Sequence, residues 1–224
     1  MSIAENLNQI KNTLLPTVDL VAVSKTKPSS FIEEAYAAGQ RIFGENRPQE
    51  MKSKAEELPK DIEWHMIGHL QSKKTKYIAP FVSLIHSVDK LSLLQEINKR
   101  AAQNERVINV LLQIFIAKEE SKFGMDEQEV EELLSSEDFK ALENICVVGL
   151  MGMATNTNDE NVVRGEFKDL KILFDSIKNS TIPAHINMEK FTVLSMGMSG
   201  DYKIAMEEGS NMIRIGSSIF GSRD

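Results

Sequence analysis

The sequence predicts an α/β protein built as one (β/α)8 barrel of the TIM type, a closed ring of eight parallel strands inside a layer of helices. Eight short segments rich in Val, Ile, Leu and Phe alternate along the chain with segments whose apolar residues recur at helical spacing. The strand segments are continuous apolar runs, which is typical of parallel strands covered by helices. Turns rich in Gly and Ser follow the last two strands, where such barrels often bind phosphate. An open, doubly wound sheet is the alternative.

An extra helix precedes the first strand. Its apolar residues Ile3, Leu7, Ile10 and Leu14 recur at helical spacing, and Pro16 marks its expected end. The enrichment in β-branched and other apolar residues then predicts eight strands, at residues 19–25, 41–45, 63–68, 83–88, 107–116, 145–151, 191–196 and 211–215.

Helical spacing occurs between most of these strands. The helical patterns lie at residues 31–36, 51–58, 91–97, 130–134, 167–177 and 202–206. Pro28 and Pro48 stand where a first helical turn tolerates a missing N–H, and Gly39 and Gly209 stand where helices commonly stop. We therefore expect one domain over residues 1–224.

Composition narrows the class of protein. A net charge of -7 argues against nucleic acid as the main ligand, and no segment approaches the roughly 20 apolar residues that cross a bilayer. The N-terminus lacks the pattern of a signal peptide, and the single cysteine, Cys146, rules out an internal disulfide. We expect a cytoplasmic protein with no membrane partner.

Lys25 is the first candidate for chemistry. It follows the apolar run 20–23, at the carboxyl end of the first strand, where such barrels place their active sites. Burial lowers the pKa of a lysine, so its neutral amine can attack an aldehyde. Lys27 is a competitor of the same strand parity, and both lysines could instead be solvated charges at a strand end.

The turns after the last two strands are the second candidate. Gly197, Met198, Ser199 and Gly200 follow the seventh strand, and residues 216–218 (Gly-Ser-Ser) follow the eighth. Glycine lets the backbone approach an anion closely, and serine adds a donor. Ordinary turns have the same composition. A phosphate site beside an amine suggests pyridoxal 5′-phosphate (PLP) held as a Schiff base.

Other polar residues lie on or after predicted strands. Arg214 is a guanidinium inside the last apolar strand, so it must face the pocket, an anion or a carboxylate such as Glu45. Asn46 ends the second strand and could donate to a cofactor ring or cap the next helix. His65 and His69 are too far apart on a strand to share a zinc ion without a third ligand, so we predict no metal site.

Seven short motifs occur in a fixed order along the chain. They are residues 23–28 (VSKTKP), 43–46 (FGEN), 64–72 (WHMIGHLQS), 119–122 (EESK), 149–151 (GLM), 194–199 (LSMGMS) and 214–221 (RIGSSIFG). Together they resemble the pyridoxal phosphate homeostasis protein family, from about residue 3 to the C-terminus. The sequence departs from the family's usual residues at Arg47-Pro48, Lys73, residues 115–118 (FIAK) and Phe123.

The resemblance implies a barrel like the N-terminal domain of alanine racemase. It places PLP on Lys25 and the phosphate near Ser199, Gly216 and Ser217, with Met198 beside them, and it makes Arg214 face the pyridine nitrogen. It also implies a cofactor carrier in vitamin B6 homeostasis, which buffers PLP or delivers it to PLP-dependent apoenzymes without established turnover.

Two other functions remain open. A PLP-dependent racemase or lyase needs an acid or base on each face of its substrate, and Tyr36, Tyr77 and Tyr202 all fall in predicted helices outside the barrel. A cofactor-free aldolase with a lysine Schiff base would be colourless. We predict no catalytic residue, and we expect a monomer, since the surface helices show no clear apolar stripe.

Overall fold

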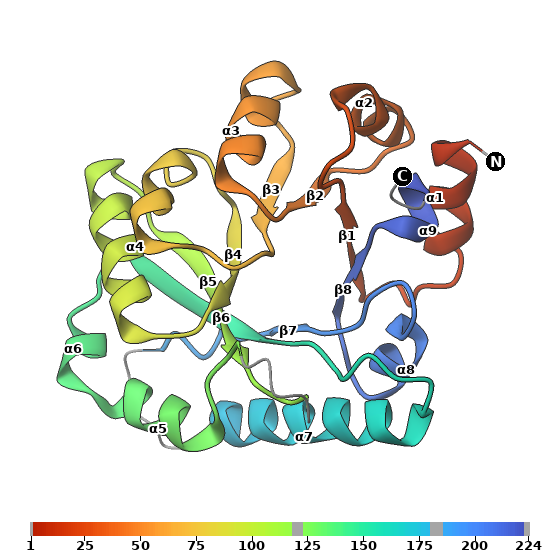
Figure 1. The fold of residues 1–224 in the computed structure, drawn as a ribbon. Coiled ribbons are helices and arrows are strands. Elements are labelled where there is room, and N and C mark those ends of the chain that lie inside the picture. Colours follow the sequence, from red (N-terminus) through yellow and green to blue (C-terminus); the bar gives the residue numbers. More distant parts are fainter. Residues whose placement is uncertain (1, 118–122, 180–185, 222–224) are drawn as a thin grey trace.

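The protein folds as a closed barrel of eight parallel strands (Figure 1), seen in a computed structural model that describes residues 2–117, 123–179 and 186–221. The strands follow the order of the chain, and the ring closes where β1 pairs with β8 through Leu20 and Ile213. This pairing excludes the open sheet. The strands are β1 (Asp19–Val23), β2 (Ile42–Glu45), β3 (Glu63–Met66), β4 (Leu84–Val88), β5 (Ile108–Ile114), β6 (Ile145–Gly152), β7 (Val193–Ser195) and β8 (Met212–Ile215).

Helices surround the ring and cover the outer faces of the strands (Figure 1). They are α1 (Ile3–Lys11), α2 (Ser29–Ala37), α3 (Pro48–Glu57), α4 (Leu91–Gln103), α5 (Glu127–Ser135), α6 (Glu137–Lys140), α7 (Glu160–Asn179), α8 (Tyr202–Glu207) and α9 (Ser217–Phe220). Between β3 and β4 the chain forms the 3-10 helix η1 (Ser72–Tyr77) rather than an α-helix.

The first helix is shorter than the sequence predicted. A capping box between Ser2 and Glu5 begins α1, but the helix ends at Lys11 rather than near Pro16. Leu14 lies in the turn that follows and packs partly buried against the core, so its apolar contact does not need the helix to continue. Asn6 Nδ2 donates to Ile219 O over 3.1 Å, which joins α1 to α9 across the β1–β8 seam.

The apolar residues form two clusters. The larger one lies between the barrel and its helices, and includes Phe43, Phe167 and Phe191, which are fully buried. The smaller one fills the inside of the ring, and its buried members are Val21, Leu84, Leu111, Val148, Met151 and Met212. The buried residues of the described chain also include polar and charged ones, among them His65, His86, Ser195 and Arg214.

No helix within the described ranges is long and apolar enough to span a membrane.

Candidate functional site

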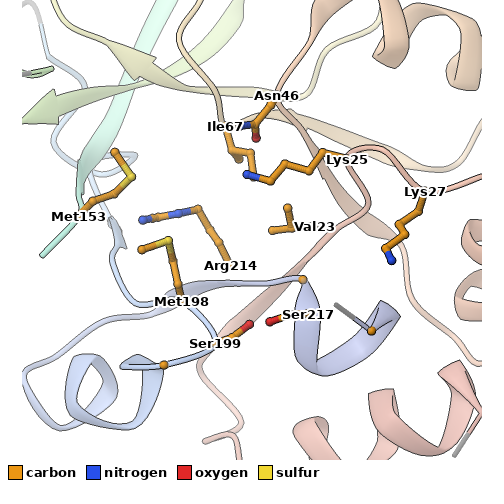
Figure 2. Close-up of a pocket in the computed structure, with 13 residues that line it drawn as sticks. Val23, Lys25, Lys27, Asn46, Ile67, Met153, Met198, Ser199, Arg214 and Ser217 are labelled. Atoms are coloured by element: carbon orange, nitrogen blue, oxygen red, sulfur yellow. The ribbon is translucent and has the colours of Figure 1, made fainter. Parts of the chain in front are cut away.

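A cavity of about 320 Å³ opens at the carboxyl ends of the strands. All seven residues predicted from the sequence as cofactor-binding line it, namely Lys25, Asn46, Met198, Ser199, Arg214, Gly216 and Ser217. They come from the ends of β1, β2, β7 and β8, which closure of the ring brings together (Figure 2). Lys27 also lines the cavity, and none of the described lining residues is a carboxylate.

Lys25 lies in a turn, not at the end of a strand as predicted. β1 ends at Val23. The Ser24 N–H still bonds to Gly44 O (3.0 Å), and the chain then turns, with the Lys27 N–H donating to Ser24 O over 3.1 Å. The Lys25 side chain extends into the cavity toward Ile67 and Arg214, whereas the Lys27 side chain takes a different direction along its edge (Figure 2). The Lys27 amine lies 6.0 Å from the centre of the Phe31 ring.

Arg214 is buried and held by oxygen acceptors. Its Nη1 donates to Ser195 O over 2.9 Å and to Ser195 Oγ over 2.6 Å, and its Nη2 donates to Gly152 O over 3.0 Å. Burial lowers the pKa of Arg214 to about 10, against the opposing effect of the Asp201 carboxylate, so the group is cationic at neutral pH. The ion pair with Glu45 is wrong, because that carboxylate pairs instead with Lys54 over 2.8 Å.

Two histidines continue the polar contacts of Arg214 inside the ring. Ser195 Oγ lies 3.1 Å from His86 Nδ1, and His86 Nε2 lies 3.0 Å from His65 Nδ1. Arginine only donates, so the Ser195 hydroxyl donates to His86 Nδ1, which leaves the His86 proton on Nε2, donated to His65. Burial lowers the pKa of His65 to about 3, and burial together with His65 and Arg214 holds the pKa of His86 well below its ordinary value. Both rings are therefore neutral.

The sequence did not reveal this role for His86, because its partners come from β3 and β7 and no local spacing connects them. The bond between His65 and His86 joins two buried side chains from neighbouring strands, so His65 has a structural role. No group of three or more potential metal ligands occurs in the described ranges.

The two Gly-Ser turns are shaped by close backbone contacts. Gly197 has φ +96°, and a Cβ there would lie 2.6 Å from Ala205 Cβ. Its carbonyl accepts from the Arg214 N–H over 3.0 Å, which links the β7 turn to β8. Asp201 Oδ1 accepts from the Met198 N–H over 2.5 Å and so closes the turn that contains Ser199. These contacts direct Ser199 and Ser217 toward the same part of the cavity (Figure 2).

Asn46 offers an orphaned polar atom to the cavity. Its Oδ1 is buried without a hydrogen-bond partner in the described structure, which costs free energy unless a ligand or water binds it. The alternative prediction, that Asn46 caps the next helix, is wrong, because the N-cap residue of α3 is Arg47 and no side chain caps it. A buried amide without a partner is what a site for a polar ring requires.

Ile67 and Met153 line the cavity but were not predicted. Met153 lies two residues after the predicted sixth strand, so its position after a strand was a usable signal, but an apolar side chain there does not suggest a ligand by itself.

A second cavity of about 250 Å³ lies beside β5 and β6 and shares Met153 and Met198 with the first. Phe115 and Phe123, two of the residues that depart from the family pattern, line it. Phe123 also contacts His69, with ring centres 5.2 Å apart. Arg47 and Lys73 are exposed. Lys118 and the motif at residues 119–122 lie outside the described residues.

The chain is similar to known proteins along its whole length. The family model described as alanine racemase, N-terminal domain, matches residues 1–224. The pyridoxal phosphate homeostasis protein of Vibrio alginolyticus is 40% identical over 213 residues, which cover 93% of this chain and 88% of the relative. That of Helicobacter pylori is 41% identical over 209 residues, covering 91% and 87%. The chain belongs to the pyridoxal phosphate homeostasis protein family.

Solved structures agree with this membership. PipY of Synechococcus elongatus has a TM-score of 0.89 without PLP and 0.88 with PLP bound, at 35% identity, covering 98% of this chain and 100% of PipY. The alanine racemase of Bartonella henselae is 16% identical with a TM-score of 0.72, and the chain covers 58% of it. At that identity the likeness concerns the fold alone.

Proposed function

We propose that the chain binds pyridoxal 5′-phosphate as a Schiff base on Lys25 and serves intracellular vitamin B6 homeostasis by buffering or delivering the cofactor. The observation that carries this proposal is the cavity. It combines an amine, a buried guanidinium and two Gly-Ser turns, and no carboxylate occurs among its described lining residues. The names of the relatives, and the PLP bound to PipY, support the same ligand here.

The residues of the cavity fit the parts of this ligand. Lys25 would hold the aldehyde: its amine, once deprotonated, would bond to the aldehyde carbon, and the aldehyde oxygen would leave as water with both amine protons. Ser199, Ser217 and the N–H groups at the start of α9 suit the phosphate. Asn46, whose Oδ1 has no described partner, suits a polar substituent of the ring.

Arg214 explains why we propose a carrier rather than an enzyme. When bound, PLP supplies an electron-accepting ring, which works best when its pyridine nitrogen is protonated. Arg214 is itself a cation with hydrogen atoms to donate and no lone pair that could accept one. A guanidinium facing the nitrogen therefore disfavours its protonation and weakens chemistry at the carbon next to the amine.

A racemase would need a second acid or base opposite Lys25. The tyrosine hydroxyls do not supply one, since Tyr36 bonds to Asp61 over 2.7 Å and Tyr202 lies 3.2 Å from Thr13 Oγ1. Tyr77 belongs to η1 and does not line the cavity. We therefore propose no turnover. Racemisation of alanine by the pure protein that disappears in Lys25→Ala would contradict this.

The remaining proposals concern the context of the site. We propose that residues 1–224 act as one PLP-binding domain, as a monomer in the cytoplasm, with PLP-dependent apoenzymes as recipients and with neither nucleic acid nor membrane as a partner. The match of the family model over residues 1–224 supports the single domain. The half-buried, unpaired Cys146 is compatible with a reducing compartment.

The decisive experiment maps the adduct. Purified protein incubated with PLP is expected to absorb in the visible, and borohydride reduction followed by peptide mapping is expected to place the label on Lys25. Lys25→Ala should lose the label, while Lys27→Ala should keep it. A label that stays in Lys25→Ala, or that maps to Lys27 in the natural chain, would overturn the assignment. A colourless protein that still forms a Schiff base with a small aldehyde substrate would favour the aldolase.

A further inference from the structure

The turn that carries Lys25 has an unusual backbone. Thr26 has φ +65° and is, with Glu105, one of two non-glycine residues with positive φ in the described chain. A β-branched residue rarely adopts this conformation, which is strained and persists only where neighbouring groups hold it. Neighbouring groups must therefore hold Thr26, the residue next to Lys25, in this conformation.

Helix α3 supplies them from a single turn. Lys54 Nζ donates to Ser24 O over 2.9 Å, and Glu50 Oε1 accepts from the Thr26 N–H over 2.6 Å. The backbone groups on both sides of Lys25 are therefore bound by two side chains four residues apart, and these form an ion pair of 2.7 Å with each other. We call Glu50 and Lys54 the α3 clamp.

The clamp is anchored beneath the cavity. The Lys54 side chain is 8% exposed, and its Nζ also donates to Glu45 Oε1 over 2.8 Å, an oxygen that accepts from Ser24 Oγ over 2.7 Å. Burial raises the pKa of Glu50, but the hydrogen bonds from Lys54 and Thr26 outweigh it, so its pKa lies below the ordinary value and it stays ionised. Buried ion pairs are weak sources of stability, but they can specify one arrangement of the chain.

The α3 clamp has a direct consequence for the two lysines of the turn. With the turn held, Lys25 extends into the cavity and Lys27 lies along its edge (Figure 2), its amine 6.0 Å from the Phe31 ring centre. A relaxed turn, with Thr26 at negative φ, would reorient the peptide groups of both lysines.

We propose that Glu50 and Lys54 are positioning residues that select Lys25 over Lys27 as the amine that receives the aldehyde. This inference rests on the proposed function, because it assumes that a lysine of this turn forms the Schiff base. Neither residue of the clamp lines the described cavity, so both act through the backbone of the turn.

Glu50→Ala tests this selection, since it removes the acceptor of the Thr26 N–H and leaves Lys54 paired with Glu45. After incubation with PLP we expect the visible band to form about tenfold more slowly, and borohydride labelling to spread from Lys25 to Lys27. Glu50→Gln keeps an oxygen acceptor and should restore most of the selection for Lys25. Glu56→Ala is the matched control, because Glu56 lies on the same helix in an exposed ion pair with Lys52 (3.6 Å).

A second measurement needs no cofactor. Hydrogen exchange of the Thr26 amide in the PLP-free protein should be slow in the natural chain, in Glu50→Gln and in Glu56→Ala, and fast in Glu50→Ala. Thermal unfolding shows whether each variant is folded. If Thr26 stays protected in Glu50→Ala, the proposed role of the α3 clamp is overturned. The same holds if this variant is labelled on Lys25 alone and forms the visible band as fast as the natural chain. A natural chain that carries no label on Lys25 would overturn the proposed function instead.

Discussion

The two ends of the barrel differ in charge. The cavity at the carboxyl ends is lined by Lys25, Lys27 and Arg214 and by no described carboxylate. A cavity of about 500 Å³ at the amino ends is lined by three carboxylates, those of Asp19, Glu63 and Glu189, and by one lysine, Lys190. Burial raises the pKa of Asp19, and an anion brought near this carboxylate would raise it further, because like charges repel. A barrel has two openings, but here only one suits an anionic ligand.

The two ends are nevertheless connected. The hydrogen bonds from Arg214 through Ser195 and His86 end at His65, which lines the amino-end cavity. The chain of donors runs in one direction only, because Arg214 cannot accept. The charge of Arg214 thus determines how the two neutral histidine rings are oriented inside the barrel.

The largest expected effect comes from adding a negative charge at one end. Ser199→Asp places a carboxylate at the predicted phosphate position and should raise the Kd for PLP by roughly 100-fold or more, because like charges repel strongly at short range. Thr192→Asp adds the same charge at the amino end, where Thr192 lines the other cavity, and should leave the Kd unchanged. Absorbance titration measures both. Equal losses in the two variants would mean that net charge, not the carboxyl-end turns, controls binding.

An effect of intermediate size is expected on the pH dependence of stability, through the buried His65. The pKa of His65 is about 3 in the folded chain and about 6.5 when unfolded, so the unfolded state binds more protons between these values. Stability from the neutral ring is complete above about pH 6.5 and is lost as pH falls toward 3, with a loss of about 2 kcal/mol at pH 5.

Urea unfolding at pH 7 and pH 5 measures this loss. His65→Gln should shrink the difference between the two pH values by about that amount, although it lowers stability at both. His69→Gln is the control, because the His69 side chain is 41% exposed and belongs to neither end of the hydrogen-bonded chain. An unchanged difference in His65→Gln would show that other groups dominate acid unfolding.

The smallest effect is expected beside the site. Phe123 is 55% exposed and lines the second cavity, not the one that contains Lys25. Phe123→Ser should therefore change the Kd for PLP by less than about threefold and stability by less than about 1 kcal/mol, as exposed substitutions usually do. A large loss of PLP binding would show that the apolar rim belongs to the cofactor site. Charge would then not be the only property that distinguishes the two ends of the barrel.

Much of the fold could be predicted because its signals are local. The eight apolar runs each became a strand, and the prolines and glycines stand at helix ends, with Pro48 at the first turn of α3 and Gly39 at φ +86° after α2. Strand ends were predicted less well. The apolar run that contains Lys25 leaves the sheet after Val23. The hydrogen bond from the Ser24 N–H to Gly44 O is the last one between β1 and β2.

The candidate residues were equally local signals. Lys25, Ser199 and Ser217 follow strands in sequence, and residues after parallel strands meet at one end of a barrel, so their shared cavity was predictable. Their roles toward PLP stay predictions until the adduct is mapped. Partners could not be predicted in the same way. Glu45 was one of the partners that Arg214 could have had, but it pairs with Lys54, which comes from the next helix and carried no signal of its own.

The amino-acid sequence by itself determined the alternation of strands and helices, the place of each Gly-Ser turn and the lysine beside them, because these depend on neighbours within a few residues. Only the tertiary structure decided which charges meet. Closure of β1 on β8 brings Arg214 to the cavity of Lys25, and the packing of α3 against β2 places Lys54 between Glu45 and the lysine turn. Such contacts join residues from distant segments. A buried charge needs a partner, and the packing of the elements determines which group lies close enough to serve as one.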